Sequence, residues 1–348
     1  MDNVTSKHIK KNFHKGKIEI KKSPVDMNYN ELDDLLDSLL KLEGLPSNIN
    51  YRSDTINYHR RSMIWIITKA LYRLVRAEIF YLTYVRKRIG QLKKSKEIFN
   101  SLKKTGCLKS LRMYLHLSKI GLTDLLNHIG GSFNDKIFAN FNIATSLYDA
   151  AFDVPECRKY LRDLDSIIVY SKNIETKDVY LALFNDCVGY LRNAMDKKSF
   201  DTFANYIKIE HISQLMSIYQ LSDKKISKES LSKITFPKGG ISLLALMHLM
   251  APKMKEKQRK AIYELGAVLQ LIDDIQDTKE DLRSGIQTLP NQKLLDHQDL
   301  KKLFFGAVNN LIYKCDINPN QANGSLDMLC WFADVLLERR YGSYLTTE

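Results

Sequence analysis

Three aspartates lie at a spacing that would let them hold cations together. Asp273, Asp277 and Asp281 are four residues apart in the stretch ELGAVLQLIDDIQDTKEDLRSGIQTLP, residues 264–290. On a helix each step of four residues drifts by only about 40°, so the three carboxylates share one face. Like charges at this spacing repel each other. Bound cations would offset that repulsion, and oxygen-only donors indicate a hard ion such as Mg²⁺.

A second aspartate pair has the same spacing. Asp149 and Asp153 end another apolar segment, NIATSLYDAAFD. Two helices that each offer a carboxylate pair can hold Mg²⁺ between them, and Mg²⁺ commonly shares its coordination with substrate phosphates. Such ions neutralise the charge of a leaving diphosphate. The alternative is a solvated acidic helix end; in either case Asp274 and Glu280 fall off the stripe, and we expect them outside the metal site.

Lys238 is the candidate cation between the two aspartate segments. It lies in the stretch FPKGG, residues 236–240, which we expect to be a loop before an apolar helix. A glycine pair allows close approach of a ligand, and a helix start can receive phosphate oxygens. Lys238 would add a point charge. A plain loop without a ligand is the equal alternative.

The elements that must position these residues are predicted to be helices. Apolar residues recur at three- and four-residue spacing, and only 15 Gly and 7 Pro interrupt the 348 residues. The sequence therefore predicts one all-α domain, a helical bundle over 29–348, after a basic and flexible extension over 1–28. The predicted helices are 30–43, 56–104, 108–129, 134–153, 156–171, 176–196, 199–221, 240–251, 255–284, 297–315 and 325–344.

Composition narrows the cellular setting and the partners. The longest mainly apolar run is about half of the ~20 residues that cross a bilayer, and no secretory signal is predicted. Five scattered cysteines without a CxxC pair indicate reduced thiols in the cytoplasm. The net charge of +13 suggests an anionic partner, but no nucleic-acid-binding motif is present. Seven lysines in the first 22 residues are compatible with peripheral contact to anionic lipid.

The two aspartate segments resemble those of the class I isoprenoid synthase superfamily. LGAVLQLIDDIQD, followed by EDLRSG and LP, looks like the second aspartate motif of squalene and phytoene synthases and of prenyl diphosphate synthases. The spacing of Asp273, Asp277 and Asp281 is most similar to the large bacterial terpene synthases of the tetraprenyl-β-curcumene synthase kind. Asp149 and Asp153 match the first motif. The resemblance covers roughly residues 130–345.

This resemblance implies a fold, a reaction and a set of ligands. It implies an all-α synthase domain in which Asp149, Asp153, Asp273, Asp277 and Asp281 bind a cluster of up to three Mg²⁺ ions. The implied substrate is an allylic prenyl diphosphate, which is ionised to a carbocation that cyclises or loses a proton, with release of diphosphate. The implied diphosphate-binding residues are Lys238, Arg158, Arg340 and Tyr341.

Departures from the family pattern leave alternatives open. The residue after Asp149 is Ala150, so the first site lacks DDxxD, and no Gly-Lys-x-x-Arg segment is present for a second diphosphate. Both departures favour a one-substrate terpene synthase. The alternatives are a prenyltransferase, either chain-elongating or head-to-head, and a non-catalytic helical binding protein. A surface helix end is the alternative for Arg340 and Tyr341, and the sequence is compatible with a homodimer.

Overall fold

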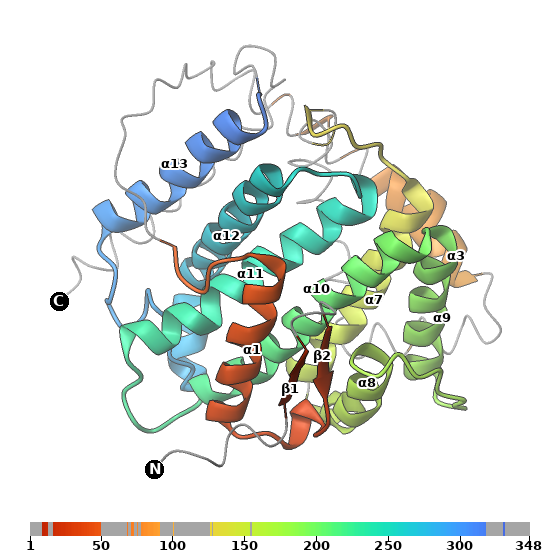
Figure 1. Ribbon diagram of the computed structural model, residues 1–348, viewed down its shortest axis with the longest axis horizontal. Coiled ribbons are helices and arrows are strands. Elements are labelled where there is room, and N and C mark those ends of the chain that lie inside the picture. Colours follow the sequence, from red (N-terminus) through yellow and green to blue (C-terminus); the bar gives the residue numbers. More distant parts are fainter. Residues whose placement is uncertain are drawn as a thin grey trace.

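Apolar residues at helical spacing place most of the described chain in helices. The computed structural model describes residues 9–12, 17–49, 68, 71–72, 75, 78–90, 100, 126, 128–153, 155–317 and 330 (Figure 1). The longer helices in these ranges are α1 Tyr29–Glu43, α7 Asp135–Asp153, α8 Leu161–Ile168, α9 Val179–Ala194, α10 Lys197–Ser217, α11 Lys228–Met250, α12 Glu256–Ser284 and α13 His297–Lys314. The shorter ones are η3 Pro24–Asp26, the π-helix η4 Tyr81–Val85, α3 Arg86–Gly90, η5 Pro155–Tyr160 and η6 Ile218–Gln220. The prediction of a mainly α-helical protein is confirmed for the described chain.

Helix ends carry the capping residues that the sequence offers. Asn28 accepts a hydrogen bond from the Glu31 amide at 3.0 Å, while the Glu31 side chain accepts from the Asn28 amide, which forms a capping box at the start of α1. Gly44 and Gly285 end α1 and α12 in the left-handed conformation that glycine adopts without strain. These signals explain why the predicted bounds of α1 and α12 lie within a residue of those observed.

Helix α11 is longer than predicted. Residues 236–240 were expected to form a loop, but α11 runs through them with Pro237 in its interior. Pro237 cannot donate to the carbonyl of Lys233, so the helix lacks one hydrogen bond there. The glycines that follow pack against α12: a Cβ on Gly239 would lie 2.5 Å from the carbonyl oxygen of Gly266. The glycines therefore allow close helix packing instead of a ligand loop.

The pair α11 and α12 forms the centre of the arrangement (Figure 1). Helix α10 packs on α11, α13 covers α12, and α1 lies against α10. Helix α7 packs on α9 and also contacts α11. The largest fully buried side chains include Tyr206, Tyr263, Phe138 and Phe304, which come from four of these helices. No helix in the described ranges meets the length and apolarity that a membrane span requires.

The segment predicted as an extension, 1–28, contains described structure. Strands β1 Ile9–Asn12 and β2 Lys17–Ile20 pair antiparallel, and Ile18 and Ile20 pack against the helical core. Further along, the Ser23 hydroxyl donates to Asp165 of α8. Residues before position 28 therefore already contact the helical body.

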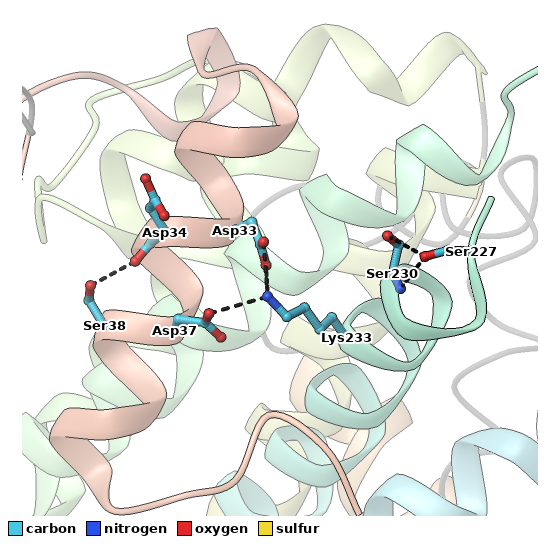
Figure 2. A network of polar contacts seen from close by, with 7 residues as sticks. All are labelled: Asp33, Asp34, Asp37, Ser38, Ser227, Ser230 and Lys233. Atoms are coloured by element: carbon cyan, nitrogen blue, oxygen red, sulfur yellow. Dashed lines mark hydrogen bonds and ion pairs between the residues drawn. The ribbon is translucent and has the colours of Figure 1, made fainter. Parts of the chain in front are cut away.

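A lysine of α11 holds an aspartate pair of α1 (Figure 2). The Nζ of Lys233 lies 3.0 Å from Asp33 Oδ2 and 3.3 Å from Asp37 Oδ2, and all three side chains keep some solvent access. Asp33 and Asp37 have the same four-residue spacing as the candidate metal-binding aspartates. In this pair the charge is compensated by a direct ion pair, which fixes the first turns of α11 to α1.

Candidate functional site

The two predicted aspartate motifs meet at Lys238. Helix α7 ends with Asp149 and Asp153, and α12 carries Asp273. The charge of Asp153 interacts with both Lys238 and Asp273, which connects the three helices α7, α11 and α12. Asp149 interacts with Lys238 as well. The structure therefore brings together Asp153 and Asp273, which are 120 positions apart in the sequence.

Burial and the charge of Lys238 shift the pKa values of Asp153 and Asp273 in opposite directions. Burial raises the pKa of Asp153 and of Asp273, while Lys238 acts to lower both. Both side chains nevertheless remain exposed to solvent. The surrounding protein removes part of the water around each carboxylate, but both carboxylates remain accessible from solvent. A polar ligand could therefore reach them.

Lys238 is the cation shared by this group of carboxylates. Burial disfavours its charge, but Asp274, Asp149, Glu210 and Asp153 outweigh that effect and raise the pKa of its ammonium. The charge of Lys238 is thus shared among carboxylates from three helices, α7, α10 and α12. This differs from Lys233 on the same helix, which pairs with two aspartates of the single helix α1.

Two members of the cluster were missed by sequence reasoning. Asp274 was expected outside the site, but it faces Lys238, and burial raises its pKa to about 7. Its Oδ1 accepts from Gln270 Nε2 at 3.1 Å, while its buried Oδ2 has no hydrogen-bond partner among the described residues. The i,i+4 spacing left Asp274 off the stripe, yet its charge interacts with Lys238 of α11. Only its adjacency to Asp273 in the sequence could have indicated this.

Glu210 of α10 is the second missed residue. Burial raises its pKa to about 8, against a hydrogen bond from Ser242 and the attraction of Lys238. Its Oε2 is buried and has no hydrogen-bond partner within the described chain. Glu210 is an isolated acid in the segment IKIEHIS, so no local spacing distinguished it from a surface residue.

The last two aspartates of the α12 stripe, Asp277 and Asp281, influence each other through their charges. Burial raises the pKa of Asp281 to about 6, and Asp277 adds to this while Lys238 opposes it. Asp277 is exposed and Asp281 is half-buried. The three stripe residues thus lie along one side of α12, with the Asp273 end nearest to α7.

Only one of the other predicted diphosphate-binding residues lies in the described part of the chain. Arg158 in η5 is exposed, and its charge acts on Asp153. Arg340 and Tyr341 lie outside the described residues. Of the four predicted diphosphate-binding residues, Lys238 and Arg158 are therefore found beside the carboxylates.

A buried polar chain supports the end of α7. The Tyr148 hydroxyl lies 3.1 Å from His211 Nδ1, and His211 Nε2 lies 3.1 Å from Asp165 Oδ1. Asp165 in turn accepts from Ser23. Phe152 packs on Tyr148 with ring centroids 5.1 Å apart. This chain fixes the residue next to Asp149 and places apolar rings beside the carboxylates.

The donor set is compatible with Mg²⁺, although the site is not a complete metal cage. Within the described ranges, no three His, Cys, Asp or Glu side chains converge closely enough to bind a metal by themselves. Mg²⁺ usually takes one or two carboxylates, water and substrate phosphate. The unpaired oxygens of Asp274 and Glu210, together with the exposed carboxylates of Asp153 and Asp273, provide donors of this kind.

Comparison with known proteins adds no assignment. No protein-family model, curated protein or solved structure matches the chain.

Proposed function

We propose that the protein is a Mg²⁺-dependent class I terpene synthase with a helical fold of the class I isoprenoid synthase type. The observation that carries the proposal is the meeting of Asp149 and Asp153 of α7 with Asp273 of α12 around Lys238. A mainly helical body and two aspartate-bearing helices on either side of a third support it. The substrate class is an allylic prenyl diphosphate.

Each group has a role that follows from its chemistry. Asp149, Asp153, Asp273, Asp277 and Asp281 hold Mg²⁺, which supplies Lewis-acid stabilisation of the diphosphate when bound. Lys238 and Arg158 bind diphosphate oxygens, and Arg340 and Tyr341 belong to the same proposed set. The buried Tyr148 and Phe152 provide an apolar wall that limits water near the reacting carbon.

The reaction breaks one carbon–oxygen bond. The electron pair leaves with the diphosphate oxygen, and the allylic carbon becomes a cation. The cation loses a proton, either directly or after cyclisation, and the released diphosphate accepts that proton. Aromatic rings beside the site can stabilise the cation by cation–π attraction.

Incubation with prenyl diphosphates of increasing chain length tests this proposal. Each substrate is supplied with Mg²⁺, with and without isopentenyl diphosphate, and hydrocarbon, alcohol and diphosphate are measured. Product from a single substrate supports the terpene synthase. Product only with isopentenyl diphosphate, or only from two copies of one substrate joined head to head, would identify a prenyltransferase instead. If no substrate is turned over and diphosphate binding does not depend on metal, the result would favour a non-catalytic helical binding protein.

The proposed setting is the cytoplasm, and a homodimer is compatible with the sequence. Fractionation and analytical ultracentrifugation of the full chain test these two points separately from the reaction.

A further inference from the structure

A group of apolar side chains is exposed in the segment that packs on the first half of α7. Leu71, Tyr72, Val75, Ile79 and Leu82 are between 49% and 60% exposed. The described residues from 71 to 80 are helical, and η4 continues them as a π-helix. In a helix, positions 71, 72, 75 and 79 fall within an arc of about 100°, so these apolar residues have the spacing of one helix face. We call the five exposed residues the 71–82 stripe.

The stripe is held outward by packing on the opposite side. Phe80 is buried and lies edge to face against Phe138 of α7, with ring centroids 5.6 Å apart. Val85, the last residue of η4, and Ile89 of α3 are fully buried. Because these residues anchor the segment in the core, the exposure of the stripe is a property of the packed helix.

Basic residues follow the stripe in the sequence. Arg86 and Lys87 come four and five residues after Leu82, and both are exposed. In the sequence, residues 68–90 contain six Lys or Arg residues and one acidic residue, Glu78. An apolar face combined with a strongly basic one is the pattern of helices that lie in the interface of an anionic membrane.

A second copy of the chain fits this face less well. Symmetric pairing would place the same basic residues of both copies against each other, and like charges across an interface are unfavourable. An interface with a protein also tends to have few charges at its core. Anionic lipid satisfies both parts of the surface, because headgroups pair with Lys and Arg while acyl chains receive Leu, Val and Ile.

We propose that the 71–82 stripe docks the protein on an anionic lipid surface, with Arg86 and Lys87 in contact with lipid phosphates. This inference does not rest on the proposed reaction. It assigns membrane contact to an element other than the basic N-terminus. Phe138, which packs on Phe80, precedes Asp149 by 11 residues, or about 16 Å of helix, so docking leaves the carboxylate cluster accessible.

Vesicle flotation with the full chain tests the docking. Wild type is compared with Ile79→Glu and with Tyr313→Glu, which alters a side chain of α13 that is 75% exposed and lies outside the stripe. Vesicles contain phosphatidylcholine alone or mixed with phosphatidylglycerol. We expect wild type and Tyr313→Glu to float with anionic vesicles only, and Ile79→Glu to lose about tenfold in partitioning because apolar burial is lost. Circular dichroism confirms that each variant is folded.

A charge variant separates the stripe from the N-terminal lysines. Lys87→Glu should reduce partitioning to anionic vesicles by more than fivefold, since one basic residue near such a surface contributes about 1 kcal/mol. Unchanged binding of Ile79→Glu and Lys87→Glu would overturn the proposal and assign any lipid binding to the N-terminus. A wild type that ignores vesicles but forms a dimer that Ile79→Glu dissociates would also overturn it, in favour of a second copy.

Discussion

Gly239 of α11 and Gly266 of α12 meet backbone against backbone. A Cβ on either glycine would lie 2.5 Å from the carbonyl oxygen of the other. This contact lies one residue from Lys238 in α11 and about two helical turns before Asp273 and Asp274 in α12. The close packing of α11 on α12 therefore sets how near the shared cation comes to the carboxylates of the second motif.

Gly266→Ala should destabilise the protein and separate the two helices. An added methyl group has no space, so we expect a loss of roughly 1–3 kcal/mol in the free energy of unfolding. Gly189→Ala in α9 is the matched control, because no atom lies within 4 Å of its added Cβ. That variant should be unchanged or more stable by roughly 0.5–1 kcal/mol. Urea unfolding measures both, and equal effects would contradict the close contact.

Lys238→Met should make the protein more dependent on Mg²⁺. Without the ammonium the carboxylates lose their shared counter-charge. We expect the free energy of unfolding at pH 8 to fall by roughly 1–3 kcal/mol, because buried carboxylates are left without a partner. The loss should shrink at pH 5, where Glu210, Asp274 and Asp281 are mostly protonated. Thermal unfolding with and without Mg²⁺ should show a larger stabilisation of this variant than of wild type.

Lys233→Met is the control for that experiment. Its ion pairs with Asp33 and Asp37 are partly exposed and should contribute only about 0.5–1 kcal/mol. Mg²⁺ should stabilise this variant no more than wild type. An equal response of both lysine variants to Mg²⁺ would show that the Lys238 cluster is not a metal site.

Glu210→Gln should stabilise the protein at alkaline pH. The folded pKa of about 8 lies above the usual 4.5, so the native state binds the proton more tightly than the unfolded state. Stability of wild type therefore falls as pH rises from about 4.5 to 8. The glutamine variant lacks this loss, and we expect it to exceed wild type by roughly 1–3 kcal/mol at pH 9. Urea unfolding at pH 4 and pH 9 measures the difference, which should be absent or reversed at pH 4.

Asp277→Ala should abolish Mg²⁺-dependent turnover while leaving the fold intact. The side chain is exposed, so its removal should change the free energy of unfolding by about 0.5 kcal/mol or less. Glu280→Ala, three residues along α12 and also exposed, is the control and should retain activity. Product formation and circular dichroism are measured together. A fully active Asp277→Ala variant would reject its role as a metal ligand.

Ser23→Ala should loosen the N-terminal segment. Its hydroxyl donates to Asp165, which also pairs with His211 in the core. Loss of the donor leaves a buried carboxylate oxygen with one partner fewer, which should cost roughly 1–2 kcal/mol. Hydrogen exchange should rise in residues 17–28 more than in α12. Exchange that is unchanged in this segment would show that the Ser23 contact does not hold it.

Much of the helix pattern was readable because local signals and packing agree. Helices α7, α12 and α13 combine apolar periodicity with clear ends, such as the Pro155 that follows α7 and the Gly285 that closes α12. The predicted bounds of these helices lie within one residue of those observed. Helix α11 was misread because Pro237, Gly239 and Gly240 interrupt a helix by their local preferences, while their contact with α12 keeps it continuous.

The sequence could group only those site residues that share a face of one helix. Spacing grouped Asp149 with Asp153, and Asp273 with Asp277 and Asp281, because i,i+4 residues share a face. It could not show that Lys238 lies between the two groups. Asp274 and Glu210 join the cluster through contacts between different helices, and neither belongs to a repeating pattern.

Pro237 separates two parts of α11 that have different contacts. On one side of the missing hydrogen bond, Lys233 clamps the helix to α1; on the other, Lys238 faces the carboxylates. Because Pro237 lacks one main-chain hydrogen bond donor between them, this turn of α11 should resist bending least. A ligand that draws Lys238 towards it would bend α11 most easily at this turn, and the movement would reach the ion pairs of Lys233 with α1, one turn away. Filling of the carboxylate cluster would then be transmitted to the first helix of the bundle.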